Sequence, residues 1–555
     1  MRIFLIALAS IILLQSSDAF SKDPKGKVKY KYRLSQAKTK FIDEDYNGAL
    51  RLYRELFEEH KTDANLNNMI GRCYLALKDM EKALEFFGNA EKINPSVDFD
   101  LYLYMGQASQ YIGQLDKALE YYNKYVAKCK KKYQVERTTV MQNIDQCKNA
   151  KYMMENPVKA KIRNMGRVIN CEFTDAAPSI TADGKTFIFT SRRADTEGGG
   201  IDPNTGYYFD DIYISTWDDQ KSDWTTAENL TDLNTPEHDA SCSISPDGNS
   251  IFLYKNIPSV TRSGDIYISK INAAGKWGAP KPLNIIVNSS FFESSACLSP
   301  DGKTLYFVSE RNGGQGNADI WMSTIDPETK DWGKPVNLGE AVNTDDDEIG
   351  VFIHPDGKTL FFTSKGHNSI GGFDVFQTVL QNGKWSKPAN LGYPINTTRD
   401  EVHFVMATDG RKAFISSSKE NGFGDYDIYE VDMSNYTFPI IDTTKSNIAV
   451  VNPVKIVENT NLSILRGSVV DADNGQKMEN IAVVITEVAS GKKVAELNTN
   501  EIGDYFITLP GDKEYQLEVT KTGYKTIVEK VTLPLGKDKV ATIYKSFNLS
   551  KDPTN

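Results

Sequence analysis

Five acidic residues recur at one position of a repeated sequence unit, and carboxylates arranged in this way could bind a cation. Each acid follows a repeated asparagine by five residues. The five acids are Asp175, Asp239, Glu293, Glu348 and Glu401. If the repeats close into a ring, equivalent positions gather at one mouth of its central channel. Five carboxylates there could hold calcium or attract a basic segment of a partner protein.

A structural role for the same acids is the alternative that the repeat favours. Every copy also carries a basic residue seven to nine positions after the glycine of its Asp-Gly pair. These residues are Arg192, Lys255, Arg311, Lys365 and Lys419. We expect acid and base to pair between adjacent strands as a clamp, because residues repeated in every copy usually serve the repeated architecture. Beyond the acidic ring as a candidate, no metal ligand is assigned.

The residues that hydrolytic enzymes use do not form a recognisable motif. The histidines are His60, His238, His354, His367 and His403, and none has the H-E-x-x-H spacing of a metalloprotease. The nearest approach to a G-x-S-x-G nucleophile elbow, at residues 366–371, contains one residue too many. A serine–histidine site assembled by the tertiary structure stays open. The sequence assigns no catalytic or cofactor-binding residue and predicts that the protein is not an enzyme.

The repeat that carries the acids runs from about residue 164 to residue 435 with a period near 54 residues. Its most regular landmark is a triplet similar to D-I-Y, which starts at Asp211, Asp265, Asp319, Asp374 and Asp427. Each copy contains an Asp-Gly turn and alternating β-branched and aromatic residues, which indicate four short strands. Four-stranded repeats arranged radially form a β-propeller, here of five blades over residues 156–435.

The first and last copies depart from this pattern. The last copy lacks the tryptophan strand, and residues 157–164, before the first copy, resemble the missing segment. We expect these residues to pair into the last blade and close the ring, which removes exposed strand edges. The first copy has about 10 extra residues in the loop 194–209. This loop breaks the symmetry and is therefore the best local candidate for a specific contact.

Residues 30–155 have helical periodicity and a repeat of about 34 residues. Small residues recur in pairs 12 positions apart, namely Ala37 and Ala49, Gly71 and Ala83, and Gly106 and Ala118. This pattern resembles the tetratricopeptide family, in which small residues stand where two helices of a pair approach closely. The resemblance implies an α-solenoid whose concave groove binds a peptide or a partner helix.

A polar linker over residues 436–462 leads into a β-rich segment at residues 463–549. This segment contains the stretch G-D-Y-F-I-T-L-P from Gly503 and a Gly-Tyr pair at Gly523. These motifs are similar to the carboxypeptidase regulatory-like domain, which implies a non-catalytic sandwich of seven strands. The segment contains no histidine, which argues against a zinc peptidase site in it. The predicted fold class is therefore multidomain α + all-β: a tetratricopeptide α-solenoid, a five-bladed β-propeller and an Ig-like or prealbumin-like β-sandwich.

Charge and the N-terminal segment indicate where the protein works. A formal charge of −10 and a pI near 5.3 argue against nucleic acid as a partner. Residues 1–19 have the parts of a secretory signal, with cleavage expected after Ala19. No cysteine stands at the cleavage point, and no other apolar stretch could span a bilayer, so we expect membrane association only through partners.

Cys129 and Cys147 could form a disulfide across two helices, with buried free thiols as the alternative.

The order of these segments resembles a PorE-like multidomain periplasmic family of Bacteroidetes. The resemblance implies association with the outer membrane and with the type IX secretion or gliding machinery. Such relatives usually continue into an OmpA-like peptidoglycan-binding domain, which this sequence does not show. We therefore expect a non-enzymatic periplasmic scaffold or adaptor that binds envelope proteins through the tetratricopeptide groove and a propeller face. The alternatives are a propeller-based peptide- or glycan-binding protein or hydrolase, and a surface adhesin.

Overall fold

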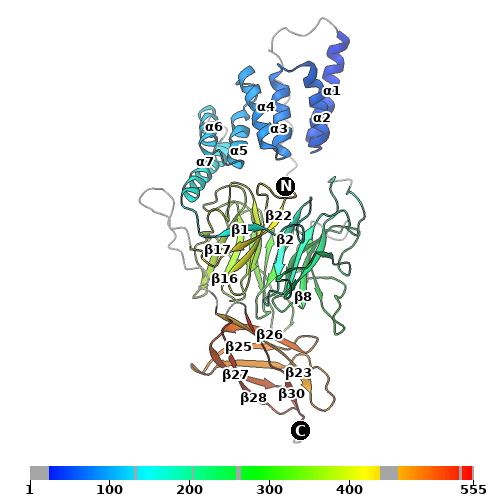
Figure 1. Cartoon of the computed structure of the whole chain (residues 1–555), viewed down its shortest axis with the longest axis vertical. Helices are drawn as coiled ribbons and strands as arrows, with labels where there is room; N and C mark the ends of the chain where they lie inside the picture. Colours follow the sequence, from blue (N-terminus) through cyan, green and yellow to red (C-terminus); the bar gives the residue numbers. More distant parts are fainter. Residues whose placement is uncertain are drawn as a thin grey trace. The chain divides into compact units, whose positions relative to one another are not determined.

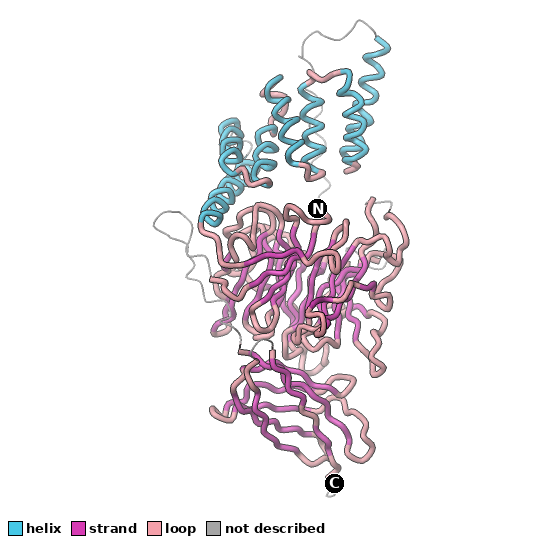
Figure 2. Tube along the Cα trace, in the orientation of Figure 1, coloured by secondary structure: helices cyan, strands magenta, loops and turns pink. Residues whose placement is uncertain are grey.

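The computed structural model describes residues 24–129, 134–202, 206–257, 264–437, 461–536 and 540–552. The expected signal segment and most of the expected linker lie outside the described residues. The chain divides into two compact units, Met1–Met141 and Gln142–Asn555. The fold class is multidomain, with tetratricopeptide-like helices in the first unit and a five-bladed propeller followed by an Ig-like sandwich in the second. Figure 1 labels the elements along the chain, and Figure 2 shows that helices are confined to the N-terminal part.

The first unit consists of helices that pack in consecutive pairs. They are α1 (Pro24–Ile42), α2 (Tyr46–Glu59), α3 (Ala64–Ala76), α4 (Met80–Ile93), α5 (Leu101–Tyr111) and α6 (Leu115–Lys128). A further helix, α7 (Gln134–Glu155), ends in the second unit. Asp45, Asp63 and Asp79 begin α2, α3 and α4, and each side chain accepts a hydrogen bond from a backbone N–H of the first turn. These caps satisfy donors that a helix start leaves without partners.

The small residues stand where two helices touch, which confirms the expectation from the repeat. A Cβ atom at Gly71 would lie 2.6 Å from the ring of Phe87 on α4, and one at Gly106 would lie 2.4 Å from the ring of Tyr122 on α6. The alanines of the pattern are fully buried. Arg72 on α3 joins neighbouring repeats, because its guanidinium lies 5.0 Å from the ring centroid of Phe41 and 5.1 Å from that of Tyr104.

The propeller consists of five antiparallel sheets, each one blade. Blade 1 contains β2 (Asp175–Ile180), β3 (Thr186–Ser191), β4 (Asp211–Asp218), β5 (Asp223–Trp224) and β6 (Glu228–Asn229); blade 2 contains β7 (Asp239–Ile244), β8 (Ser250–Lys255), β9 (Asp265–Lys270) and β10 (Lys281–Pro282). Blade 3 contains β11 (Glu293–Leu298), β12 (Thr304–Ser309), β13 (Asp319–Thr324) and β14 (Val336–Asn337). Blade 4 contains β15 (Glu348–Ile353), β16 (Thr359–Ser364), β17 (Asp374–Gln381), β18 (Lys384–Trp385) and β19 (Ala389–Asn390).

The last blade closes the ring as the sequence predicted. It contains β20 (Glu401–Met406), β21 (Lys412–Ser417), β22 (Asp427–Asp432) and β1 (Lys161–Asn164). Strand β1 pairs antiparallel with β22, so residues before the first repeat complete the last one. The expectation for residues 157–164 is therefore confirmed. Buried aromatic rings also join the two ends of the repeat, since Phe187 of blade 1 lies 4.9 Å from Phe414 of blade 5.

The repeat places its landmark residues at one end of every blade. In blade 3, for example, Glu293 pairs with Ser309, and Ser309 pairs with Asp319 on the third strand. The Asp-Gly pairs lie at the other end, in the turn between the first and second strands, where each glycine has a φ between 68° and 79°. Most residues avoid this left-handed conformation, which explains the repeated glycine.

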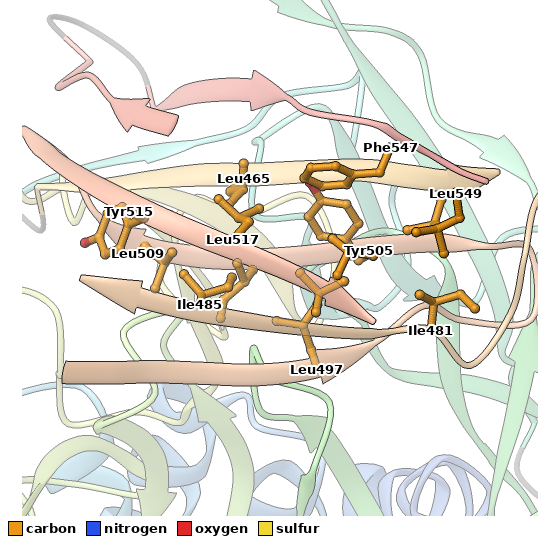
Figure 3. Packing of buried hydrophobic residues seen from close by; sticks show 14 of the residues in the cluster. Leu465, Ile481, Ile485, Leu497, Tyr505, Leu509, Tyr515, Leu517, Phe547 and Leu549 are labelled. Carbon is orange, nitrogen blue, oxygen red and sulfur yellow. The ribbon is translucent and has the colours of Figure 1, made fainter. Parts of the chain in front are cut away.

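The C-terminal segment forms a sandwich of two sheets. One contains β23 (Leu462–Asp471), β26 (Asp504–Pro510), β29 (Ala541–Tyr544) and β30 (Phe547–Leu549); the other contains β24 (Ala482–Glu487), β25 (Lys492–Asn498), β27 (Lys513–Thr520) and β28 (Ile527–Leu533). The described residues thus show eight strands where the resemblance to the carboxypeptidase regulatory-like domain implied seven. Figure 3 shows the apolar side chains between the sheets, among them Leu465, Tyr505 and Phe547.

Two further expectations concern thiols and membranes. Cys147 is a buried free thiol, and no disulfide joins it to Cys129. Burial raises the pKa of the Cys147 thiol to about 12, so it stays uncharged. Within the described part of the chain, no helix combines the length and the apolar character that crossing a bilayer requires.

Candidate functional site

The five repeated acids each begin the first strand of a blade and are buried. Their exposed fractions are 0% or 1%. Each carboxylate accepts a hydrogen bond from the backbone N–H four residues earlier, at Cys171, Thr235, Ser289, Thr344 and Thr397. In blades 2 to 5 the hydroxyl of that same residue also donates to the carboxylate. Each acid thus fastens the loop before its blade to the start of the first strand.

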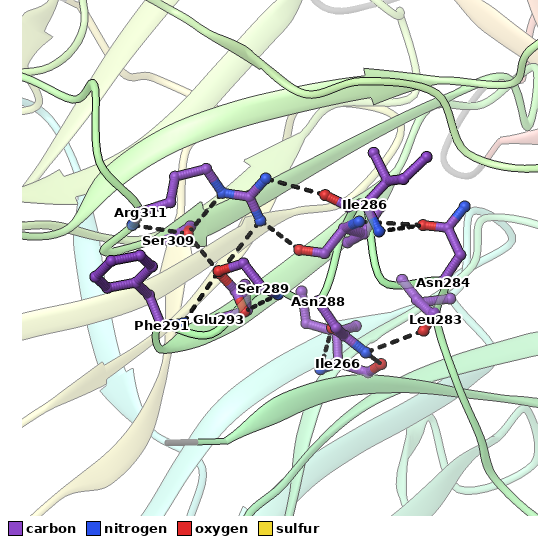
Figure 4. Close-up of polar contacts among 11 residues, drawn as sticks. Ile266, Leu283, Asn284, Ile286, Asn288, Ser289, Phe291, Glu293, Ser309 and Arg311 are labelled. Carbon is purple, nitrogen blue, oxygen red and sulfur yellow. Dashed lines mark hydrogen bonds and ion pairs between the residues drawn. The ribbon is translucent and has the colours of Figure 1, made fainter. Parts of the chain in front are cut away.

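Blade 3 shows the complete arrangement (Figure 4). Glu293 accepts hydrogen bonds from Ser289 and from the hydroxyl of Ser309, 2.7 Å away. Arg311 approaches the same carboxylate with Nη2 at 3.2 Å and donates from Nη1 to the carbonyl of Ile286 at 3.1 Å. Nη2 also donates to the carbonyl of Val287. Arg311 therefore bridges the acid and the turn that precedes it.

Three of the predicted acid–base pairs are confirmed. Lys255 pairs with Asp239, Arg311 with Glu293, and Lys419 with Glu401. Both members of each pair are largely buried. A charge held this way is costly to leave alone, so these pairs are structural clamps of the blades.

The pairs predicted for Arg192 and Lys365 are wrong. Arg192 binds Asp210 through Nε at 2.8 Å, and the next residue, Arg193, contacts Asp175 at 3.2 Å. Lys365 lies 3.6 Å from Asp347 instead of Glu348. The reason is the alternation of side chains along an extended backbone. In blades 1, 3 and 5 the clamp cation stands two residues after the serine that ends the second strand, whereas Arg192 and Lys365 stand one residue after it and point elsewhere.

Glu348 is the exception in the ring. Within the described residues it has no cationic partner, because the clamp position of blade 4 is occupied by Gly366. Burial raises the pKa of Glu348 to about 7, and the nearby Asp319 adds to this rise. Burial also raises the pKa of Asp175, although Arg193 and hydrogen bonds oppose the shift.

The geometry of the acidic ring favours clamps over a metal centre. The carboxylates are occupied by donors from their own blade, and none is exposed to solvent. Among the residues that the structure describes, no group of three or more His, Cys, Asp or Glu side chains could hold a metal ion. The ring is therefore explained by the architecture of the propeller.

Two histidines of the propeller contact backbone carbonyls. His367 contacts the carbonyl of Val342 at 2.8 Å, and His354 contacts the carbonyl of Ala407 at 3.3 Å. Burial lowers the pKa of His403 to about 4, so this imidazole is neutral. Ser369, the serine of the elbow-like stretch, donates to the carbonyl of Lys365. Ser369 and His367, which are close in sequence, thus each contact a different backbone carbonyl.

One polar cluster lies beside the long loop of blade 1 and was not predicted. The ring of His238 lies between two carboxylates, with Nδ1 2.9 Å from Asp210 and Nε2 3.4 Å from Asp202. Arg192 binds Asp210 with two donors. The hydrogen bond to Asp210 raises the pKa of His238. The extra length of the loop was the one feature of the sequence that pointed to this region. No spacing rule links Asp202 to a histidine 36 residues later.

The same loop exposes apolar side chains. Ile201 is 58% exposed and Tyr207 is 46% exposed. Arg192 lies over the ring of Tyr207, at 5.6 Å from the centroid. The loop therefore combines a charged attachment to the blade with an apolar surface, a combination that suits protein contacts.

In the helical unit, a surface hollow of about 470 Å³ runs along α2. It is lined by Asn47, Leu50, Arg51, Arg54, Glu55 and Glu58. Glu55 pairs with Arg33 of α1 at 3.2 Å. The lining residues are polar and charged apart from Leu50, as on a solvated helix face.

Comparison with protein families identifies two segments of the chain. Residues 41–96 match the model of the tetratricopeptide repeat, and residues 464–544 match that of the carboxypeptidase regulatory-like domain. The search of curated proteins found no match.

Several solved structures are similar to parts of the chain. TolB from Acinetobacter baumannii is 17% identical over 48% of this chain and 57% of its own, with a TM-score of 0.30. An α-L-arabinofuranosidase from Lactobacillus brevis is 12% identical over 48% of this chain and 92% of its own, with a TM-score of 0.32. The TPR2B domain of yeast Sti1, solved in complex with pHsp70, is 19% identical over 22% of this chain and 93% of its own, with a TM-score of 0.19. The chain thus spans just over half of the TolB chain.

Proposed function

We propose that this protein is a non-enzymatic scaffold or adaptor that joins proteins of the cell envelope. The proposal rests on the observation that the repeated charged residues bind one another within the blades. Four of the five ring acids are neutralised by cations of their own blade, and all five accept hydrogen bonds from it. Residues engaged in this way hold a rigid body together and are not available for bond chemistry.

The match of residues 41–96 to the tetratricopeptide repeat supports partner binding. Stacked helix pairs of this kind provide an extended surface on which a peptide or a helix can lie. A scaffold of this design binds one partner through the helices and another through the propeller. Because the two binding units are covalently linked, weak contacts at each reinforce one another through effective concentration.

We place the protein in the periplasm, associated with the outer membrane through its partners. The expected secretory signal at residues 1–19 supports this location. The order of segments also favours a role beside the type IX secretion or gliding machinery, on the resemblance to PorE-like proteins.

The loop of blade 1 is the propeller contact that we consider first. Its exposed Ile201 and Tyr207 lie beside a partly buried charged cluster, which offers a partner an apolar surface next to charge. Replacing both side chains with serine removes apolar contact area and the contact of Tyr207 with Arg192, and it keeps His238, Asp202 and Asp210.

Affinity purification from the native envelope tests the proposal. The full chain, the chain without residues 30–128 and the Ile201→Ser/Tyr207→Ser variant are compared. We expect one membrane complex to co-purify with the full chain and to be lost or reduced with each variant. Retention of the same partners by both variants, or turnover of a peptide or glycan by the full chain, would refute the scaffold.

A further inference from the structure

Blade 4 departs from the other blades at the clamp cation. In the others, the clamp cation also donates to the carbonyl just before the repeated asparagine. These contacts are Arg193 to Ile169, Lys255 to Leu233, Arg311 to Val287 and Lys419 to Ile395. In blade 4 the equivalent carbonyl, at Val342, is contacted by His367. The carbonyl of Val342 therefore has a partner in blade 4, but among the described residues Glu348 has no cation.

The neighbours of Glu348 are neutral donors. Its carboxylate accepts from the backbone N–H of Thr344 at 2.8 Å, from the hydroxyl of Thr344 at 2.7 Å and from the hydroxyl of Ser364 at 2.7 Å. The side chain is 0% exposed. These hydrogen bonds lower the pKa of Glu348, but burial without a counter-charge raises it by more, so this carboxylate binds a proton more readily than an exposed one.

In the part of the chain that the structure describes, the cations nearest to Glu348 are paired with other acids. Strand β13 contributes Asp319, which disfavours the ionised form. The first strands of the flanking blades begin with Glu293 and Glu401, which are already paired with Arg311 and Lys419. Strand β20 also carries the neutral His403, and β16 contributes the uncharged Ser364. Lys365, just beyond β16, is engaged by Asp347.

The groups that bind Glu348 also shape the loops that hold α7. The hydroxyl of Thr344 accepts from the N–H of Asp346, whose carboxylate accepts from Gln142 of α7 at 2.6 Å. The hydroxyl of Ser364 accepts from the N–H of Gly366 at 2.9 Å. Glu348 is thus connected by hydrogen bonds to both segments that α7 contacts, at Thr344–Asp346 and at Ser364–Gly366.

Three amide side chains on one side of α7 complete the attachment. Gln142 and Gln146 donate to the carbonyl of Lys365, and Asn149 donates to the carbonyl of Ser369 at 3.1 Å. A Cβ atom at Gly366 would lie 2.3 Å from the hydroxyl of Thr344. A lysine or arginine therefore does not fit at the clamp position while this loop keeps the shape that receives α7.

We propose that Glu348 is a proton-dependent latch for α7: its protonated form keeps residues 142–155 attached to blade 4, and loss of the proton loosens them. An ionised Glu348 on β15 lies beside Asp319 on β13 and favours separation of these two strands. Separation admits water and moves the like charges apart. The hydroxyls of Thr344 and Ser364 that donate to this carboxylate also accept from the N–H groups of Asp346 and Gly366, which lie in the two segments that α7 contacts, so the attachment of α7 loosens with it.

The direction of the effect follows from linkage. The pKa of Glu348 is about 7 in the folded protein and near 4.5 when the group is exposed. The contribution of Glu348 to stability is therefore greatest below about pH 4.5 and decreases as the pH rises toward and through 7. Between pH 6 and pH 8.5, these values imply an increase of roughly tenfold in the opening equilibrium.

Hydrogen exchange of the full-length chain at these two pH values tests the latch. We expect amides in residues 142–155 and 365–371 to lose about tenfold protection at the higher pH, after correction for intrinsic rates. Glu348→Gln cannot ionise and should show less than a twofold change. The matched control is Glu293→Gln in blade 3, whose pH dependence should equal that of the wild type.

Two results would overturn the latch: equal protection of wild-type α7 at both pH values, or an unchanged pH dependence in Glu348→Gln. If Glu348→Gln fails to fold, Asp319→Asn provides a second test. Removal of the neighbouring charge should lower the pH at which α7 loses protection, relative to the wild type. No change in that pH would contradict the proposal. The measurement needs no partner protein, so its failure is distinct from failure of the proposed scaffold.

Discussion

Arg311 and Glu293 form a buried ion pair that also fixes the turn before their blade, since Arg311 reaches the carboxylate at 3.2 Å and the carbonyl of Ile286 at 3.1 Å. Arg311→Met leaves Glu293 buried without its cation. We expect the free energy of propeller unfolding to decrease by about 3 kcal/mol. Adding Glu293→Gln should recover part of this loss, and chemical denaturation of both variants measures it.

An exposed pair provides the control for this prediction. Lys493 and Glu496 lie 2.8 Å apart in the sandwich, with side chains 60% and 50% exposed. Lys493→Ala should leave the free energy of unfolding nearly unchanged, because water screens an exposed pair. Equal effects at the two pairs would show that burial of the clamp does not matter.

Closure of the ring predicts equal roles for two asparagines far apart in sequence. Asn164 on β1 donates to Asp427 at 2.7 Å, and Asn337 donates to Asp319 at 2.9 Å. Each also accepts from the glycine N–H two residues later. Asn164→Ala and Asn337→Ala should each destabilise the propeller by about 1–3 kcal/mol. A negligible effect of Asn164→Ala in thermal unfolding would indicate that β1 does not close the ring in solution.

The helical unit should respond in opposite ways to the same substitution at two glycines. Gly106→Ala places a Cβ 2.4 Å from the ring of Tyr122, so the helix pair must separate and stability should decrease by about 1–3 kcal/mol. Gly88→Ala in α4 meets no atom within 4 Å and should increase stability by up to about 1 kcal/mol through helix propensity. Helical circular dichroism during thermal unfolding measures both. The same sign for the two variants would contradict the close approach.

The cluster at the blade 1 loop predicts a titration near neutral pH. The hydrogen bond to Asp210 raises the pKa of His238, and Asp202 adds to the rise. The stabilisation by this group is present below the ordinary pKa of about 6.5 and is lost as the pH rises through the higher folded value. Asp202→Asn should therefore lower the pKa of His238. Histidine NMR across this range measures it, with His238→Gln to assign the signal, and an unchanged pKa would exclude the contact.

The acidic ring shows how far sequence reasoning reached at the candidate site. The acids at Glu293 and Glu401 and their partners Arg311 and Lys419 were identified because both recur in every copy. The cation of blade 1 was misassigned by one residue, since a distance counted from the Asp-Gly turn does not tell which side of an extended backbone a side chain occupies. The structure resolves this, because Ser191 pairs with Asp175 and fixes the alternation.

The sequence by itself determined the number of blades, the helical repeat and the closure through residues 157–164, because these depend on periodicity and on local strand, turn and packing preferences. Only the tertiary structure decided that Glu348 has no cationic partner among the described residues and that His238 contacts Asp202 and Asp210. Burial and charge pairing depend on what neighbouring strands and loops bring to a point in space. Those distances are set by the packing of the closed ring and do not appear in the spacing of residues along the chain.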